Sequence, residues 1–124
     1  MKTQNHWSDL IVWQEAHKLV LSIYTLLPSL PKEENYALAD QIKRAAYSVP
    51  SNIVEGYSKN SDKDFARFLY ISRGSLEELR YFLILSKDLG YISKEKYNKY
   101  KVQTEKVSKL LNGLIKAVKG RIGK

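Results

Sequence analysis

A row of polar side chains between residues 44 and 56 contains residue types that hydrolytic enzymes use. Arg44, Ser48, Asn52 and Glu55 lie within about 80° of one another on a helix, beside an apolar stripe. Such a row could be catalytic, structural or a binding face. Such chemistry requires a carboxylate that is partnered by a base, a nucleophile or a metal ligand. The rest of the sequence therefore decides whether the row can be catalytic.

The other candidate groups supply little of what catalysis requires. The chain has two histidines and no cysteine. Glu15 and His17 are two positions apart, so they do not form the Glu-x-x-His pair of di-iron bundles, and His17 is expected to be a hydrogen-bonded core residue. Residues 73–75 (RGS) are expected inside a helix rather than in a phosphate-binding loop. We therefore predict a protein that is not an enzyme, with no metal and no cofactor.

Pro50 lies in the middle of the same row and bears on its structural role. A proline inside a helix has no N–H group and its ring clashes with the carbonyl four residues earlier, so we expect the helix to bend or restart there. Ser48 or Asn52 could satisfy the freed backbone groups. Gly56 is expected to let the chain leave the helix.

The row is therefore interpreted as structural, tying its helix to a neighbour. We expect that neighbour to be the helix over 61–89, where Gly74 would permit close approach of the two helices. An alternative remains open, in which Arg44 and Glu55 line a partner site at a subunit boundary. The residues of this structural or partner motif are Arg44, Ser48, Pro50, Asn52, Glu55, Gly56, Gly74 and Ser75.

Four segments of the chain carry apolar residues at helical spacing, and each begins with a helix-start signal. They cover about residues 8–27, 36–56, 61–89 and 93–118. Short connections make consecutive helices antiparallel. The pattern predicts an all-α protein, an antiparallel up-down-up-down four-helix bundle that forms one domain over residues 1–124.

The composition is that of an ordinary globular protein. Of 124 residues, 44% are hydrophobic and 27% are charged. No apolar run approaches the roughly 20 residues that cross a bilayer, and the first residues lack the apolar core of a signal peptide. We therefore expect a cytoplasmic protein without membrane contact.

The formal net charge of +8 is concentrated near the end of the sequence. Residues 94–124 carry ten Lys or Arg against two Glu, whereas residues 1–93 are balanced. Such a block indicates a polyanionic partner, nucleic acid above all, although solvated lysines are the simpler alternative. On a helix, six lysines lie opposite the apolar seam, with no aromatic residue interleaved on that outer face. These are Lys94, Lys101, Lys106, Lys109, Lys116 and Lys119.

The segment over 61–89 has an apolar face of roughly 200°, about twice what one bundle seam needs. Either this helix is the most buried one in the monomer, or another subunit covers part of it. The second interpretation predicts an oligomer interface that contains Phe68, Ile71, Phe82 and Leu85.

Three motifs resemble those of a known family. They are residues 9–16 (DLIVWQEA), 41–56 (QIKRAAYSVPSNIVEG) and 68–79 (FLYISRGSLEEL). In this order they resemble the bacterial four-helix bundle proteins encoded in intervening sequences of 23S ribosomal RNA. Val54 stands where alanine is common in that family, and Trp7 where phenylalanine is usual.

The resemblance implies a ring-like homopentamer with an RNA-associated role. It also implies a more distant similarity to the accessory variability determinant proteins of diversity-generating retroelements, basic pentamers that work with a reverse transcriptase. We therefore predict a non-enzymatic homo-oligomer whose basic surface binds structured RNA with low sequence specificity. The alternative is a protein-interaction module or accessory subunit of a nucleic-acid enzyme such as a reverse transcriptase.

Overall fold

Four long helices dominate the computed structural model, which describes residues 6–123. They are α1 (Ile11–Leu26), α2 (Leu38–Tyr57), α3 (Asp62–Asp88) and α4 (Lys94–Arg121). Three single-turn 3-10 helices, η1 (Trp7–Asp9), η2 (Leu27–Ser29) and η3 (Lys32–Glu34), flank α1 and lead into α2. No strand occurs among the described residues, so the predicted all-α class with four helices is confirmed.

Local signals in the sequence account for where α3 and α4 begin and end. The hydroxyl oxygens of Ser61 and Ser93 each accept a hydrogen bond from the amide three residues later, at 3.1 Å. Gly90, with φ of +80°, ends α3, and the amide of Tyr91 donates to the carbonyl of Ser86 (2.9 Å), as in a Schellman motif.

The first two helices begin later than predicted. Ser8 lies within η1 rather than capping a helix at residue 8, and its amide donates to His6 Nδ1 at 3.2 Å. The start of α2 is held by Glu34, whose carboxylate accepts from the amide of Leu38 at 3.3 Å. The helix α2 therefore begins two residues after the predicted start at residue 36.

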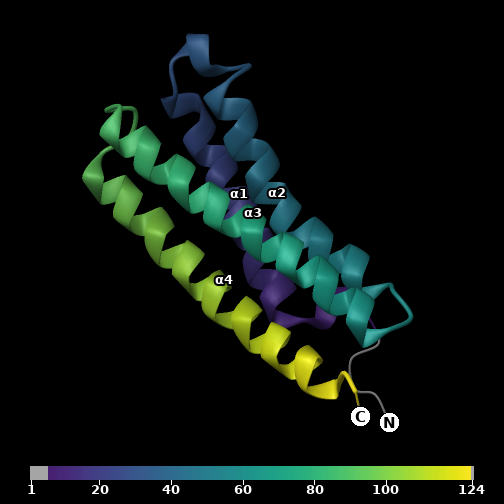
Figure 1. Ribbon diagram of the computed structural model, residues 1–124. Helices are drawn as coiled ribbons and strands as arrows, with labels where there is room; N and C mark the ends of the chain where they lie inside the picture. The colour runs from purple at the N-terminus through teal and green to yellow at the C-terminus, as the bar shows by residue number, and fades with distance from the viewer. Residues whose placement is uncertain (1–5, 124) are drawn as a thin grey trace.

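Each chain connection turns the helix direction back, as Figure 1 shows. The helix α3 packs against both α2 and α4, and α1 packs against α2 and α4. Their shared core is built from fully buried aliphatic side chains of all four helices. The largest of these are Leu19, Ile23, Leu26, Ile42, Val49, Ile53, Leu69, Leu76, Leu79, Leu83, Val107 and Leu111.

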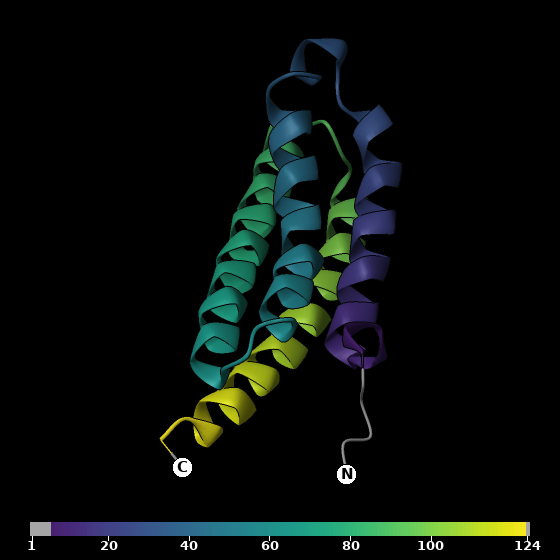
Figure 2. The ribbon, with the colours of Figure 1, turned by 90° about the vertical axis from the view of Figure 1, so that its right-hand side faces the viewer.

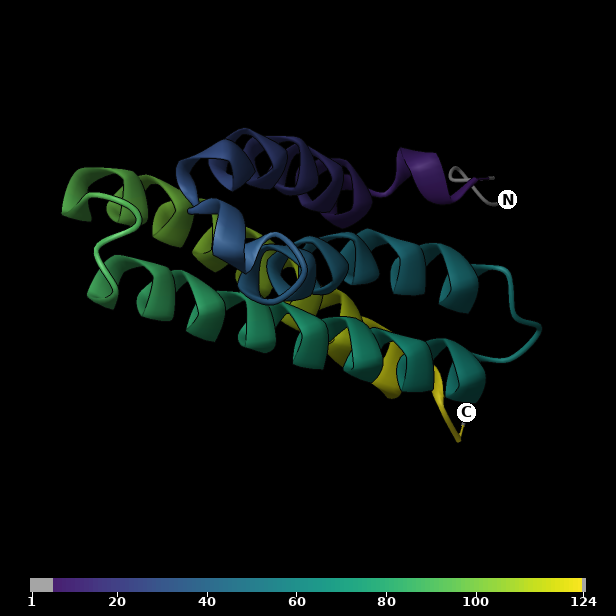
Figure 3. The same ribbon diagram turned by 90° about the horizontal axis from the view of Figure 1, so that it is seen from above.

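The helix α4 crosses the bundle obliquely (Figures 2 and 3). Near its start, Gln103 donates to the hydroxyl of Ser22 on α1 at 2.9 Å. At its other end, Arg121 bonds both carboxylate oxygens of Asp62, the first residue of α3, at 3.0 and 3.2 Å. One flank of α4 therefore faces α1, and the other flank faces α3.

Candidate nucleic-acid interface

The six lysines predicted on α4 are all exposed, but they do not form a single stripe. Lys106 turns toward α1, where its ammonium lies 3.3 Å from Glu15 Oε1. Lys101 and Lys119 turn the other way, toward α3. The prediction of one common outward stripe is therefore corrected for Lys106, because α4 has a helix on either side of it.

Glu15 is held as a carboxylate by the two lysines beside it. The hydrogen bond from Lys18 (3.2 Å) and then the contact with Lys106 lower the pKa of Glu15. Part of the Lys106 charge is thereby balanced within the chain. We exclude Lys106 from the candidate interface for this reason.

The remaining five lysines lie within about 80° of one another on α4, at 100° per residue. They are Lys94, Lys101, Lys109, Lys116 and Lys119. The arc lies on the flank of α4 that faces α3. Arg73 of α3 donates across this boundary to Asn112 Oδ1 at 3.1 Å.

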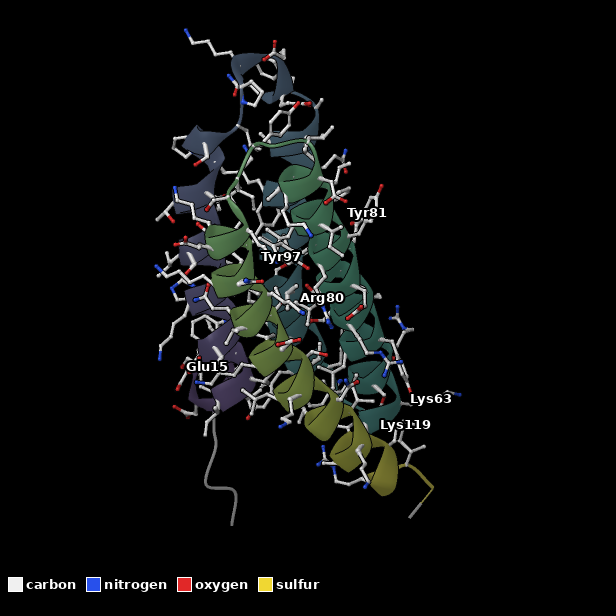
Figure 4. The ribbon with its side chains drawn as sticks, turned by 90° about the vertical axis from the view of Figure 1, so that its left-hand side faces the viewer. Glu15, Lys63, Arg80, Tyr81, Tyr97 and Lys119 are labelled. Atoms are coloured by element: carbon white, nitrogen blue, oxygen red, sulfur yellow. The ribbon has the colours of Figure 1, made fainter. Side chains whose placement is uncertain are left out.

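The structure adds cations from α3 that the sequence analysis missed. Arg80 and Lys101 line one shallow depression of about 250 Å³ between α3 and α4, and Lys87 lies 4.6 Å from the ring centroid of Tyr97. Figure 4 shows Arg80 and Tyr97 along this boundary, with Lys63 and Lys119 at its end. The α3 cations are Lys63, Arg67, Arg73, Arg80 and Lys87. Arg73, Arg80 and Lys87 are spaced seven residues apart, which places them on the same side of a helix. This spacing could have predicted their cluster from the sequence.

We call these five α3 residues and the five α4 lysines the basic face. Its ten cations are accompanied by five carboxylates, which leaves a formal charge of 10 − 5 = +5 when Asp62, bonded to Arg121, is set aside as a neutral pair. Three of the carboxylates are ion-paired within the face, to Arg67 (3.8 Å), Arg80 (3.0 Å) and Lys87 (3.6 Å). The five carboxylates are Asp64, Glu77, Glu78, Asp88 and Glu105.

An ion pair fixes the end of the basic face. The hydrogen bonds from Arg121 lower the pKa of Asp62, and those same bonds raise the pKa of Arg121. Two parallel bonds between a guanidinium and a carboxylate hold their partners in one relative orientation. The end of α4 is thus held beside the start of α3.

The polar row on α2 makes a hydrogen-bonded tie to α3. The hydroxyls of Ser48 and Ser75 lie 2.8 Å apart, and Asn52 donates to the carbonyl (2.8 Å) and hydroxyl (2.9 Å) of Ser48. Buried Ser72 donates to the carbonyl of Val49 at 2.8 Å. These bonds lie next to buried Pro50, and α2 continues through it from Leu38 to Tyr57, so the helix does not restart there.

Two members of the row point elsewhere. Arg44 Nε donates to Asp40 Oδ2 (2.9 Å) on its own helix, which raises the pKa of Arg44. Glu55 Oε2 lies 3.0 Å from the ammonium of Lys59. Neither side chain contributes a bond to α3, so the expectation that Glu55 ties the two helices is corrected.

Neither glycine has the role that the sequence predicts. Gly74 is exposed, and a Cβ placed there would have no described atom within 4 Å. Gly56 is buried inside α2, where a Cβ would lie 2.8 Å from Phe68 Cβ. The close approach of α2 and α3 is therefore at Gly56, and Gly74 does not permit it.

Replacing Asn52 with alanine is expected to lower the free energy of unfolding by about 1 to 3 kcal/mol, because two hydrogen bonds of a half-buried group are lost. Glu55→Ala is the control, since an exposed ion pair contributes less than about 1 kcal/mol. Urea unfolding of both variants measures the difference. Equal losses would contradict the assignment of the stabilising hydrogen bonds to Asn52 rather than to Glu55.

The four residues predicted at an oligomer interface differ in how exposed they are. Ile71 is 44% exposed, whereas Phe68, Phe82 and Leu85 are half-buried. Phe82 and Leu85 pack against the core of their own chain. Much of the wide apolar arc of α3 is thus covered within the monomer, and Ile71 is the member most available to another subunit.

The predicted core histidine is on the surface. His17 is exposed, and its ring stacks on Trp13 with centroids 5.1 Å apart and planes 5° apart. Its helical position borders the apolar seam but points outside it. Within residues 6–123, no cluster of three His, Cys, Asp or Glu side chains is arranged to hold a metal ion.

The described helices give no indication of a membrane span. None of the helices between residues 6 and 123 combines the length and apolarity that crossing a bilayer requires.

The geometry defines a class of protein, a four-helix protein with a basic face along two of its helices. Residues 8–113 match the family described as the 23S rRNA-intervening sequence protein, and the chain belongs to this family. The predicted resemblance is confirmed.

A solved structure is similar over most of its length. It is a crystal structure, at 1.70 Å resolution, of a protein of unknown function from the S23 ribosomal protein family of Bacteroides thetaiotaomicron. The TM-score is 0.79 at 27% identity, covering 86% of this chain and 99% of that one. No curated protein matches the chain significantly.

Proposed function

We propose that this protein is a non-enzymatic, homo-oligomeric RNA-associated protein whose basic face binds structured RNA with low sequence specificity. The observation that carries the proposal is the formal charge of +5 on the surface shared by α3 and α4. Basic side chains release condensed counterions when they meet a phosphate backbone, which gives affinity without reading bases. Lysine is a point charge, so specificity would come from the shape of the RNA.

The family description supports RNA as the partner, since it refers to intervening sequences of ribosomal RNA. We infer an up-down-up-down bundle that assembles as a ring-like pentamer. Five copies would carry a formal charge of 5 × 8 = +40. Repeating the basic face around a ring would give several weak contacts a high combined affinity.

Titration of a structured 23S ribosomal RNA fragment at several salt concentrations tests the proposal. The test variant replaces Lys101, Lys109 and Lys116 with glutamine. Each lost phosphate contact removes roughly 0.7 to 0.9 from the slope of log affinity against log salt, so we expect the slope to fall by about 2 to 3.

The control removes the same charge outside the basic face, through glutamine at Lys18, Lys32 and Lys43. It should keep most of the affinity and the salt slope of the unmodified chain. Equal affinities and slopes in all three proteins would identify the α4 lysines as an ordinary solvated surface and would end the proposal.

A second candidate function is an accessory subunit of a nucleic-acid enzyme such as a reverse transcriptase. The observation in its favour is on α1, where Leu21 is 57% exposed one helical turn after His17, whose exposed ring stacks on Trp13. Exposed apolar residues that gather in one place mark protein contacts. Pull-down of such an enzyme with and without ribonuclease separates the two functions, because only a direct protein contact survives the nuclease.

A further inference from the structure

The end of the basic face holds an aromatic depression that the charge pattern alone does not explain. About 330 Å³ of space lies between the start of α3 and the end of α4, within the size range of small-ligand sites. In Figure 4, Lys63 and Lys119 mark its two sides. Its lining residues are Lys63, Asp64, Ala66, Arg67, Tyr70, Lys119 and Ile122.

Tyr70 gives this depression an aromatic wall. The side chain is 37% exposed, and two cations lie near its ring, with Arg73 Cζ at 4.9 Å and Lys119 Nζ at 5.8 Å from the centroid. Ala66 and Ile122 add apolar surface. The arrangement combines a ring that is accessible to a planar ligand with cations at its edge.

Charge selects the class of ligand. Lys63, Arg67 and Lys119 line the depression, Arg73 lies beside the Tyr70 ring, and the guanidinium of Arg67 lies 4.5 Å from the centroid of the neighbouring Phe68 ring. Asp64 is the one carboxylate in the lining. Asp64 lies 3.8 Å from Arg67 Nε, and the other nearby carboxylate, that of Asp62, is bonded to Arg121. The surplus of three positive charges favours an anion, and the aromatic wall favours one that carries a planar ring.

We propose that this depression binds one unpaired nucleotide of the RNA, with its base stacked on Tyr70 and its phosphates held by Lys63, Arg67 and Lys119. This rests on the proposed RNA-binding function and adds a site to it. Unpaired bases are recognised by stacking on aromatic rings and guanidinium planes, whereas bases inside a duplex are inaccessible to such contacts. Lys119, on a flexible stem, moves from the ring to a phosphate when the base enters. The site gives the protein a preference for RNA with loops or bulges over continuous duplex.

The test compares two RNAs of equal length, a hairpin with an unpaired loop and a fully paired duplex, bound to the full chain at fixed salt. Tyr70→Leu removes the aromatic wall but keeps an apolar side chain. We expect about a tenfold weaker affinity for the hairpin, an unchanged affinity for the duplex and an unchanged salt slope. Tyr70→Phe should bind like the unmodified chain, because it keeps the ring.

Tyr81→Leu is the matched control, since Tyr81 is an exposed tyrosine on α3 outside the depression. It should leave both affinities unchanged. Lys63→Gln is a second variant that does not alter the wall, and it should reduce the hairpin salt slope by roughly 0.7 to 0.9.

Three results would overturn the proposal, and they are distinguishable. If Tyr70→Leu binds both RNAs normally while the α4 lysine variant loses its salt slope, the basic face stands and the nucleotide site falls. If Tyr70→Leu changes the oligomeric mass rather than hairpin affinity, the depression is an interface between copies of the chain. If the unmodified chain binds neither RNA, the proposed function fails and the nucleotide site with it.

Discussion

Gly56→Ala is expected to destabilise the protein by about 1 to 3 kcal/mol, even though alanine forms helices better than glycine. The new Cβ would lie 2.8 Å from Phe68 Cβ, 3.0 Å from Phe65 Cδ1 and 3.2 Å from the Phe65 carbonyl oxygen. Two of these atoms are at or next to the backbone of α3, so they cannot move aside without separating the helices. Overpacking of this kind outweighs the gain of about 1 kcal/mol in helix propensity.

Gly74→Ala is the matched control, because Gly74 is also inside a long helix. Its Cβ would have no described atom within 4 Å, so only the propensity gain remains. We expect the free energy of unfolding to rise by about 0.5 to 1 kcal/mol. Urea denaturation of the two variants should therefore give changes of opposite sign. A similar rise in both would show that α2 and α3 are not in close contact at Gly56.

The two glycines show how far the sequence could predict this fold. The spacing of apolar residues predicts each helix, since burial of one face depends on a period that is visible in the sequence. It does not show which glycine faces a neighbouring helix. Gly56 faces Phe65 and Phe68 because the short connection between α2 and α3 brings the end of one helix beside the start of the next.

The basic face shows the same limit for a functional surface. The sequence predicts that Lys101, Lys106 and Lys119 lie away from the core, and all three are exposed. Their neighbours depend on the oblique crossing of α4, which places Lys106 beside Glu15 of α1 and Lys119 beside Tyr70 of α3. The contribution of α3 was missed because its cations are balanced by acids in a simple count along the chain.

The aromatic wall was missed for a related reason. The outer face of α4 carries no aromatic residue among its lysines, and the ring that lies beside Lys119, that of Tyr70, belongs to α3. Contacts between helices combine residues that are 49 positions apart, such as Tyr70 and Lys119. Periodicity within one helix carries no information on such a pair.

Ile71→Asp is expected to convert an oligomer into a monomer. In a pentamer the mass by light scattering would be about 72 kDa, five times the 14.3 kDa of one chain, and the variant should return to 14.3 kDa. Ile71, Phe82 and Leu85 lie on one side of α3 at helical spacing, and exposed Leu89 directly follows the helix. This side is the proposed contact. An unpaired carboxylate in an apolar interface costs several kcal/mol.

The Ile71→Asp variant should dissociate without unfolding. Ile71 is 44% exposed in the single chain, so the new carboxylate would be solvated in the monomer. Phe82→Asp is less informative, since Phe82 packs against the core and its replacement should also unfold the chain. Val102→Asp is the control, at a position on α4 that is 63% exposed and outside the proposed contact. It should keep the oligomeric mass. A mass of 14.3 kDa for the unmodified chain at every concentration would refute the oligomer, and dissociation by Val102→Asp but not by Ile71→Asp would move the contact to α4.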